Sequence, residues 1–245
     1  GSHSTWKDKG WKIVQALAEL RDHGDEMDRY TLGKLQRDVQ AMKARAMPEI
    51  TKGIVQEIRD ARKDVELARG KRQQAAVAEV NSWSSALLGD ELRTMQALIT
   101  LAVNTPGGGF STGSRAGEKL QEIWQDALAS GDKHQIRAIS EVLAVVTPKD
   151  PDAVRAANQI RALAERKVQE LRYTPELQEA DHQLVEAENY LIRTVDAERE
   201  SLQLMGEPDP LNFGTGPIAA ELRAIHIVQD GTIELEPVKG VENVK

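Results

Sequence analysis

The 245-residue sequence contains no cysteine, and this absence excludes several kinds of structure and chemistry. Without thiols the chain has no disulfide framework, no thiolate metal site and no cysteine nucleophile. Aromatic residues make up only 4% of the chain, whereas charged residues make up 29%. This balance, with many Ala, Leu, Gln, Glu and Arg residues, favours long helices with narrow apolar seams over a wide sheet-based core.

Long apolar runs are missing as well. The longest apolar stretch, residues 95–103, is interrupted by Gln96 and Thr100 and is shorter than the roughly 18 residues that a membrane span needs. No signal-peptide pattern occurs. We therefore expect a cytoplasmic or other intracellular-type protein with no membrane partner, and a virion component is an alternative. Gly1-Ser2-His3 is typical of a tag-cleavage remnant, and the missing initiator Met suggests a piece of a longer protein.

The net charge of −7 is distributed unevenly along the chain. Counted from the sequence, residues 1–75 carry +4, residues 76–175 carry −1 and residues 176–245 carry −10. Such asymmetry indicates that the two ends meet different partners or attract each other, within one molecule or between copies. The simpler interpretation is that basic and acidic helices pack side by side.

Apolar periodicity predicts helices over most of the first hundred residues. A first helix is expected over residues 5–22 and a second from Thr31, and Pro48 either starts a new helix or kinks this one. From Ile50 to Leu87, apolar residues recur with a mean spacing of about 3.7, which predicts a long straight helix. Gly89 is expected to end that helix and Asp90 to cap the next one.

The remaining chain contains a glycine-rich stretch, further helices and a hairpin. Residues 105–114 are too rich in glycine for a helix. Helices are predicted over residues 115–129, after Asp132 and after Asp150-Pro151, and a heptad seam of leucines begins after Pro175. The seam consists of Leu177, Leu184 and Leu191, and we expect Leu184 to be buried. In the tail, Asp230-Gly231 between alternating apolar residues predicts a β hairpin that docks on the helices or on a partner.

Together these patterns predict a mainly all-α fold, an elongated bundle of long antiparallel helices with a small C-terminal β hairpin. We expect an N-terminal helical arm over residues 1–104, of which 1–3 are the tag remnant, and a glycine-rich linker over 105–114. A helical bundle unit over 115–206 and a C-terminal segment with the hairpin over 207–245 follow.

Two glycine motifs were considered as catalytic or phosphate-binding sites. Residues 109–113 match the Gly-x-Ser-x-Gly pattern around a nucleophile such as Ser111, but that pattern requires a multi-stranded sheet that the sequence does not predict. The same glycines lack the Gly-Lys-Ser/Thr ending of a phosphate-binding loop. The linker interpretation is preferred, and we predict no catalytic residue, no cofactor and no enzymatic activity.

A metal site is a weaker hypothesis. Glu179 and His182 have the Glu-x-x-His spacing of di-metal carboxylate bundles, and Glu186 lies one turn further along the same face. Such sites need a second Glu-x-x-His pair and two more helical glutamates. The other histidines with a helical setting have no glutamate three residues before them. We therefore favour a solvated helix face.

A basic segment and one tryptophan are the candidate interaction residues. The basic side chains are Arg59, Arg62, Lys63, Arg69, Lys71 and Arg72. They could follow a phosphate backbone, but acidic residues interrupt them and no aromatic residues interleave for base stacking. An ion-paired helix surface is the alternative. Among the four tryptophans, Trp11 is expected to be the exposed one and an interface anchor.

The function that these patterns favour is structural, and no motif in the chain resembles that of a known family. We expect an assembly module, of scaffold, virion or adaptor type, that mediates protein–protein interaction with another protein or with further copies of itself. The first alternative is a nucleic-acid-associated assembly factor that uses the basic helices. The remote alternative is a helical-bundle metalloenzyme or a Ser111 hydrolase.

Overall fold

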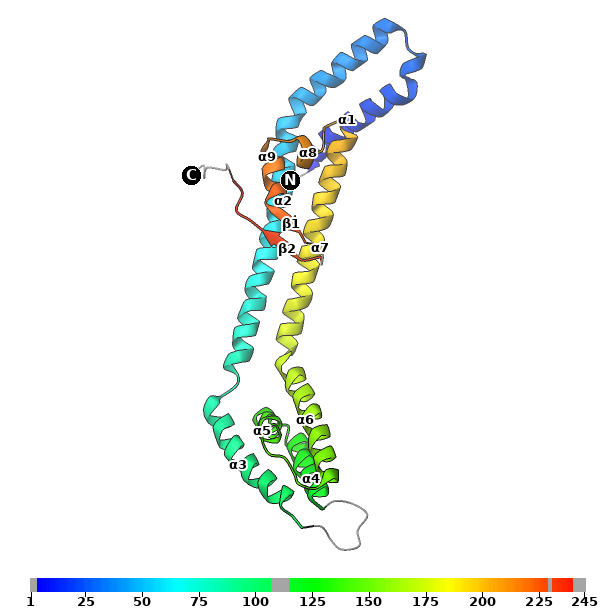
Figure 1. The fold of residues 1–245 in the computed structure, drawn as a ribbon. Helices are drawn as coiled ribbons and strands as arrows, with labels where there is room; N and C mark the ends of the chain where they lie inside the picture. The colour runs from blue at the N-terminus through cyan, green and yellow to red at the C-terminus, as the bar shows by residue number, and fades with distance from the viewer. Residues whose placement is uncertain (1–3, 107–114, 229–230, 240–245) are drawn as a thin grey trace. The chain divides into compact units, whose positions relative to one another are not determined.

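The computed structural model describes residues 4–106, 115–228 and 231–239 and is mainly helical, as Figure 1 shows. The described residues form nine α-helices, one short 3₁₀ helix (η1) and a two-stranded antiparallel sheet, so the predicted mainly-α fold with a C-terminal hairpin is confirmed. In chain order the elements are α1 (Ser4–His23), η1 (Gly24–Glu26), α2 (Arg29–Asn81), α3 (Ser85–Val103), α4 (Arg115–Ser130), α5 (Lys133–Leu143), α6 (Pro151–Arg172), α7 (Pro175–Leu204), α8 (Pro210–Phe213), α9 (Pro217–Arg223), β1 (Ile225–Ile227) and β2 (Ile233–Leu235).

The chain forms two compact units that do not follow the order of the sequence. Unit 1 comprises residues 1–70 and 182–245, and unit 2 comprises residues 71–181. The four segments expected from the sequence group the chain differently, because glycine content and periodicity do not reveal which distant helices pack together. The division falls inside α2 and inside α7. Of the predicted linker, residues 107–114, which include Ser111, lie outside the described residues.

The core of unit 1 is built by both ends of the chain. It contains buried side chains from α1, α2, α7, α9 and β2 (Figure 1). The largest fully buried ones are Ile13, Ile50, Ile54, Ile58, Leu191 and Ile233. The residues from α2 recur every three or four positions, so they line one stripe of the helix, as an amphipathic helix requires.

Unit 2 has a separate core formed mainly by four helices. α5 packs against α3 and α6, and α4 packs against the same two helices (Figure 1). The largest fully buried side chains in this unit are Leu120, Ile136, Ile139, Ile160 and Ile99. Two of these helices begin as predicted, because Asp132 caps α5 and Asp150 caps α6 with Pro151 in the first helical turn.

The long helix ends earlier than predicted, whereas at Pro48 it follows one of the two alternatives, a continuing helix. Pro48 lies inside α2, which continues through it. The end predicted at Gly89 is wrong, because α2 ends at Asn81 and Gly89 lies within α3. Ser84 caps α3 by accepting a hydrogen bond from the Leu87 amide at 3.3 Å. A tertiary contact, in which the Ser84 amide donates to His134, stabilises this break, and local sequence could not show it.

The apolar rows predicted from periodicity are buried only in part. Along the row from Ile50, burial persists to Ala68, whereas Val80 and Leu87 are exposed. In the leucine seam, Leu191 is fully buried but Leu184 is only half-buried at the edge of the unit 1 core. The prediction that Leu184 is buried was therefore too strong, because each half of the long helices meets a different set of neighbours.

The hairpin docks within the same chain. Ile225, His226 and Ile227 pair in register with Leu235, Glu234 and Ile233. Ile233 is buried in the unit 1 core, so the hairpin has an apolar attachment. Gly231 has a φ of +84°, which favours glycine at this turn, while residues 229–230 of the predicted turn lie outside the described residues.

Candidate functional site

The predicted basic segment forms contacts mainly within its own unit. Arg59 Nε lies 2.5 Å from Oε1 of Glu221, a glutamate of α9 that is only 1% exposed. A buried carboxylate needs such a partner, because an unpaired buried charge is costly. The guanidinium of Arg59 is therefore used to hold α9 on α2.

Two further arginines hold the hairpin against α2. Arg62 donates to the carbonyl oxygen of Glu236, and Arg69 donates to that of Ile233. Arg69 also pairs with Glu188 of α7 at 3.2 Å. These contacts occupy backbone acceptors of β2 and its continuation, which explains how a two-stranded sheet is stabilised in this protein.

The other basic candidates, Arg72, Lys63 and Lys71, do not hold α9 or the hairpin. Arg72 pairs with Asp181 in unit 2, and Asp181 also accepts from the Tyr173 hydroxyl at 2.9 Å. Lys63 and Lys71 are exposed. The ion pairs of the arginines match the simpler interpretation of the charge gradient, in which basic and acidic helices pack side by side.

The candidate metal residues lie on an exposed face of α7. His182 Nε2 is 3.2 Å from Glu186 Oε1, and both side chains are largely exposed, as is Glu179. Among the described residues, no group of three or more histidine or acidic side chains is placed to hold a metal ion. The structure thus pairs His182 with Glu186 as i, i+4 neighbours on the helix surface.

Trp11 is exposed, as expected, and lies beside a cleft in unit 1. The cleft has a volume of about 340 Å³ and is formed by α1, α2, the end of α7 and Met205. We call it the Trp11 cleft, and it is lined by Trp6, Lys7, Gly10, Trp11, Val14, Ile50, Ala197, Glu198, Ser201, Leu204 and Met205. Trp11 is 60% exposed and Leu204 is 53% exposed, so two large apolar side chains meet water here.

The walls of the cleft depend on glycines that allow close packing. The indole of Trp6 lies against Gly53 of α2, where any larger residue would overlap the ring. On α1, a side chain at Gly10 would begin to touch the sulfur of Met205, at 3.4 Å. The indole N–H of Trp6 is buried and has no hydrogen-bond partner among the described residues. Trp6 is therefore held by shape and apolar contact.

A buried acidic residue, Glu198, lies in the wall of the Trp11 cleft. The pKa of Glu198 is raised to about 8, chiefly by burial. A hydrogen bond with Glu57 and the Glu57 charge also raise this pKa, whereas the Lys7 charge lowers it. Lys7 Nζ is 2.5 Å from Oε1 of Glu57, and this hydrogen bond raises the pKa of Lys7. Glu198 is therefore largely protonated at neutral pH and adds little charge to the cleft.

The sequence analysis missed Glu198, although a signal for it exists. Glu198 follows Val195 by three residues and precedes Leu202 by four, so it occupies the buried stripe of α7. An acidic residue at a position where the helix periodicity requires an apolar one is the pattern that identifies it. Only the fold reveals its partners, Lys7 and Glu57, because both lie far away in the sequence.

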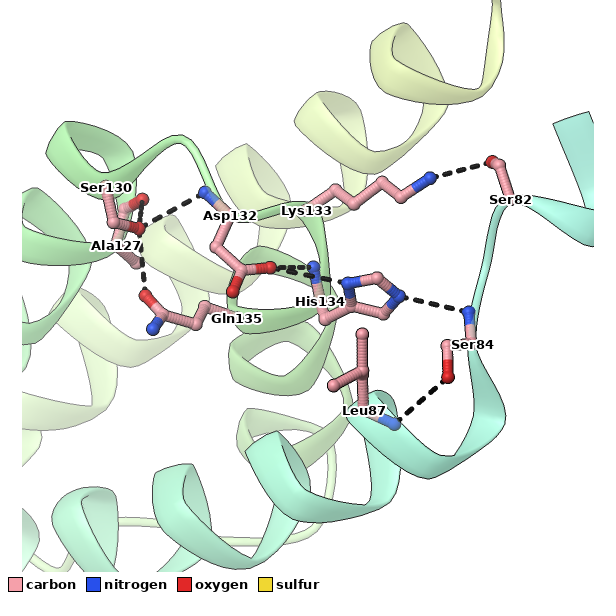
Figure 2. A network of polar contacts seen from close by, with 9 residues as sticks. All are labelled: Ser82, Ser84, Leu87, Ala127, Ser130, Asp132, Lys133, His134 and Gln135. Atoms are coloured by element: carbon pink, nitrogen blue, oxygen red, sulfur yellow. Dashed lines mark hydrogen bonds and ion pairs between the residues drawn. The ribbon is translucent and has the colours of Figure 1, made fainter.

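Unit 2 contains a second polar arrangement where α2 ends and α5 begins (Figure 2). Nε2 of His134 accepts from the Ser84 amide at 3.1 Å, and Nδ1 faces Asp132 Oδ1 at 3.4 Å. Lys133 Nζ donates to the Ser82 hydroxyl at 2.7 Å. These contacts join the start of α3 to the start of α5.

Comparisons with protein-family models, with curated proteins and with solved structures gave no match for this chain. None of the described helices combines the length and the apolar character needed to cross a membrane. The functional inference below therefore rests on the geometry of the described residues alone.

Proposed function

We propose that this protein is a structural assembly module, and that the Trp11 cleft binds a second copy of the chain. The observation that carries this proposal is the exposed Trp11 at the rim of an apolar cleft. Tryptophan is the residue type most enriched among those that dominate binding energy at interfaces. A 60% exposed tryptophan beside a cleft is the arrangement expected of an interface anchor.

A second copy suits this surface because anchor and cleft are neighbours on it. In a two-fold symmetric pair the same patch of each subunit faces the other, so each Trp11 enters the partner copy's cleft. A volume of about 340 Å³ lies within the range of sites that enclose drug-sized molecules, so it accommodates an indole. Leu204 adds apolar surface at the rim. The protonated Glu198 adds little charge to the wall at neutral pH, and the charged Lys7 of the lining is paired with Glu57.

The proposal is tested by measuring molar mass against concentration. Light scattering or sedimentation equilibrium over about 1–300 µM covers the affinities expected for a modest interface. The wild-type mass should rise from the monomer value of 27.1 kDa towards twice that value. Trp11→Glu places a charge in the apolar contact, and the loss of an anchor worth at least about 2 kcal/mol weakens pairing at least roughly 30-fold.

Tyr30→Glu is the matched control. Tyr30 is also an exposed aromatic residue of unit 1, at 78%, but it does not line the Trp11 cleft. This variant should associate like the wild type. A wild-type protein that stays at 27.1 kDa throughout, or a Trp11→Glu variant that associates as strongly as the wild type, would show that the proposal is wrong.

The nucleic-acid alternative stays a prediction with less structural support. Binding a phosphate backbone through Arg59, Arg62 and Arg69 would require these side chains to leave their contacts with α9, α7 and the hairpin. The exposed Lys63 and Lys71 offer few charges for the salt-dependent affinity that such binding needs.

A further inference from the structure

The ring of Trp83 in unit 2 is surrounded by three cationic side chains. Lys133 Nζ lies 4.8 Å from the ring centroid, Arg137 Cζ lies at 5.6 Å and Arg172 Cζ at 5.7 Å. All three cations are therefore within 5.7 Å of one point. We call Trp83 with these three residues the Trp83 cation cluster. Its four members are half-buried.

Three carboxylates lie around this cluster, and their contacts are to Arg137, to the Trp83 indole and to His134 rather than to Lys133 or Arg172. Arg137 pairs with Glu141 at 2.8 Å, and Glu79 accepts from the Trp83 indole N–H at 2.7 Å. Neither Lys133 nor Arg172 forms an ion pair with a carboxylate of the described residues, and the hydrogen-bond partner of Lys133 is an uncharged hydroxyl. Lys133 and Arg172 thus both lie near the Trp83 ring without a carboxylate ion pair of their own.

The N-terminus of α3 adds to the positive potential at the same place. The capping residue of α3, Ser84, and that of α5, Asp132, meet at His134 (Figure 2). His134 itself stacks edge-on to Trp83, with ring centroids 5.7 Å apart and planes at 68°. The start of α3, capped by the neutral Ser84, contributes a partial positive charge beside Trp83, whereas the Asp132 carboxylate offsets the partial charge at the start of α5.

From these features we propose that the Trp83 cation cluster binds the phosphate group of a small molecule. A guanidinium presents five N–H donors in a fork that matches phosphate oxygens, and an ammonium presents three. The Arg172 guanidinium makes no hydrogen bond to the described residues, and the Lys133 ammonium uses one donor on Ser82. The unused N–H donors of Arg172 and Lys133 outnumber the hydrogen bonds that one carboxylate can accept. A phosphate dianion offers three or four oxygens and two negative charges, so it matches these donors better.

The test is calorimetric titration of the full chain with inorganic phosphate and with phenyl phosphate, at pH 7.5 and constant ionic strength set with sodium chloride. We expect saturable binding with a dissociation constant of about 1 mM or lower. The double variant Lys133→Gln/Arg172→Gln should bind at least about tenfold more weakly. Tighter binding of phenyl phosphate identifies a phosphate ester as the ligand, and tighter binding of inorganic phosphate identifies the free ion. Either order supports the site.

Lys119→Gln is the matched control, because Lys119 lies in the same unit but pairs with Glu122 on the surface of α4. It should bind phosphate like the wild type. The backbone and indole ¹H–¹⁵N spectrum shows whether each variant is folded and whether phosphate shifts the Trp83 indole signal. The proposal is overturned if neither phosphate probe binds saturably, or if a folded double variant binds as tightly as the wild type.

Discussion

Replacing Gly53 of α2 by alanine has two opposite effects on stability, a gain in helix preference and a steric conflict with Trp6. An alanine in a helix interior is normally preferred over glycine, because glycine loses more backbone entropy on folding. At Gly53, however, an added Cβ would lie 2.6 Å from Nε1 of Trp6 and closer still to Cδ2 and Cε2 of the ring. Real Cβ atoms do not approach other atoms this closely, so the indole or α1 must move.

The relative size of the two effects decides whether Gly53→Ala raises or lowers the free energy of unfolding. The helix preference contributes about 0.5–1 kcal/mol in favour of alanine. Overpacking a buried site costs about 1–3 kcal/mol, because side chains leave their preferred rotamers and the backbone shifts. We therefore expect Gly53→Ala to lower the free energy of unfolding by about 0.5–2 kcal/mol.

Gly70 provides the matched control in the same helix. A Cβ at Gly70 meets nothing within 4 Å, and the residue is exposed. Gly70→Ala should therefore raise the free energy of unfolding by about 0.5–1 kcal/mol. Denaturant unfolding followed by circular dichroism gives both values, with unchanged denaturant dependence as the check that the unfolding transition is comparable.

A double variant isolates the contact. In a Trp6→Leu background the smaller side chain leaves room for a methyl group, so Gly53→Ala should lose its penalty. If Gly53→Ala stabilised the wild-type protein as much as Gly70→Ala does, the close packing of Trp6 on α2 would be refuted.

Two further predictions concern the unit 1 core. Because the pKa of Glu198 is raised from 4.5 to about 8 in the folded protein, its stabilising contribution is complete below about pH 4.5 and is lost as pH rises through about 8. Between pH 5 and 9 the free energy of unfolding should fall by about 1–3 kcal/mol more in the wild type than in Glu198→Gln. The difference is smaller than the full pKa shift implies, because Glu57 and Lys7 share the titration. Parallel pH profiles from denaturant unfolding would contradict this. Leu191→Ala should cost about 2–5 kcal/mol and the half-buried Leu184→Ala clearly less, and equal unfolding midpoints for these two variants would contradict the assigned burial.

Local features of the fold were predictable because local chemistry determines them. Asp132 and Asp150-Pro151 each precede an apolar periodic segment and begin a helix there, since the aspartate oxygen accepts a hydrogen bond from a free amide of the first turn. The strands around Gly231 followed from alternation and from the left-handed conformation that glycine adopts easily. Exposure of Trp11 was expected for a similar reason, because it lies off the apolar stripe that contains Ile13.

The candidate sites were only partly predictable. Trp11 was identified from the sequence, but the cleft beside it requires α1, α2 and α7 to meet. Glu198 was missed, because its environment depends on Glu57 and Lys7, which lie more than a hundred residues away. The Trp83 cation cluster likewise joins the turn between α2 and α3 to residues of α5 and α6 that no sequence spacing connects.

The sequence by itself determined that the chain is mainly helical, where most helices begin, and that it ends in a hairpin. These properties depend on caps, glycines and periodicity, which act over a few residues. The tertiary structure decided which basic residues are paired, where α2 ends and which tryptophan rings meet cations. Arg59 became a partner of Glu221, and α2 ended at Asn81 rather than at Gly89, because burial and charge depend on neighbours that are distant in the chain.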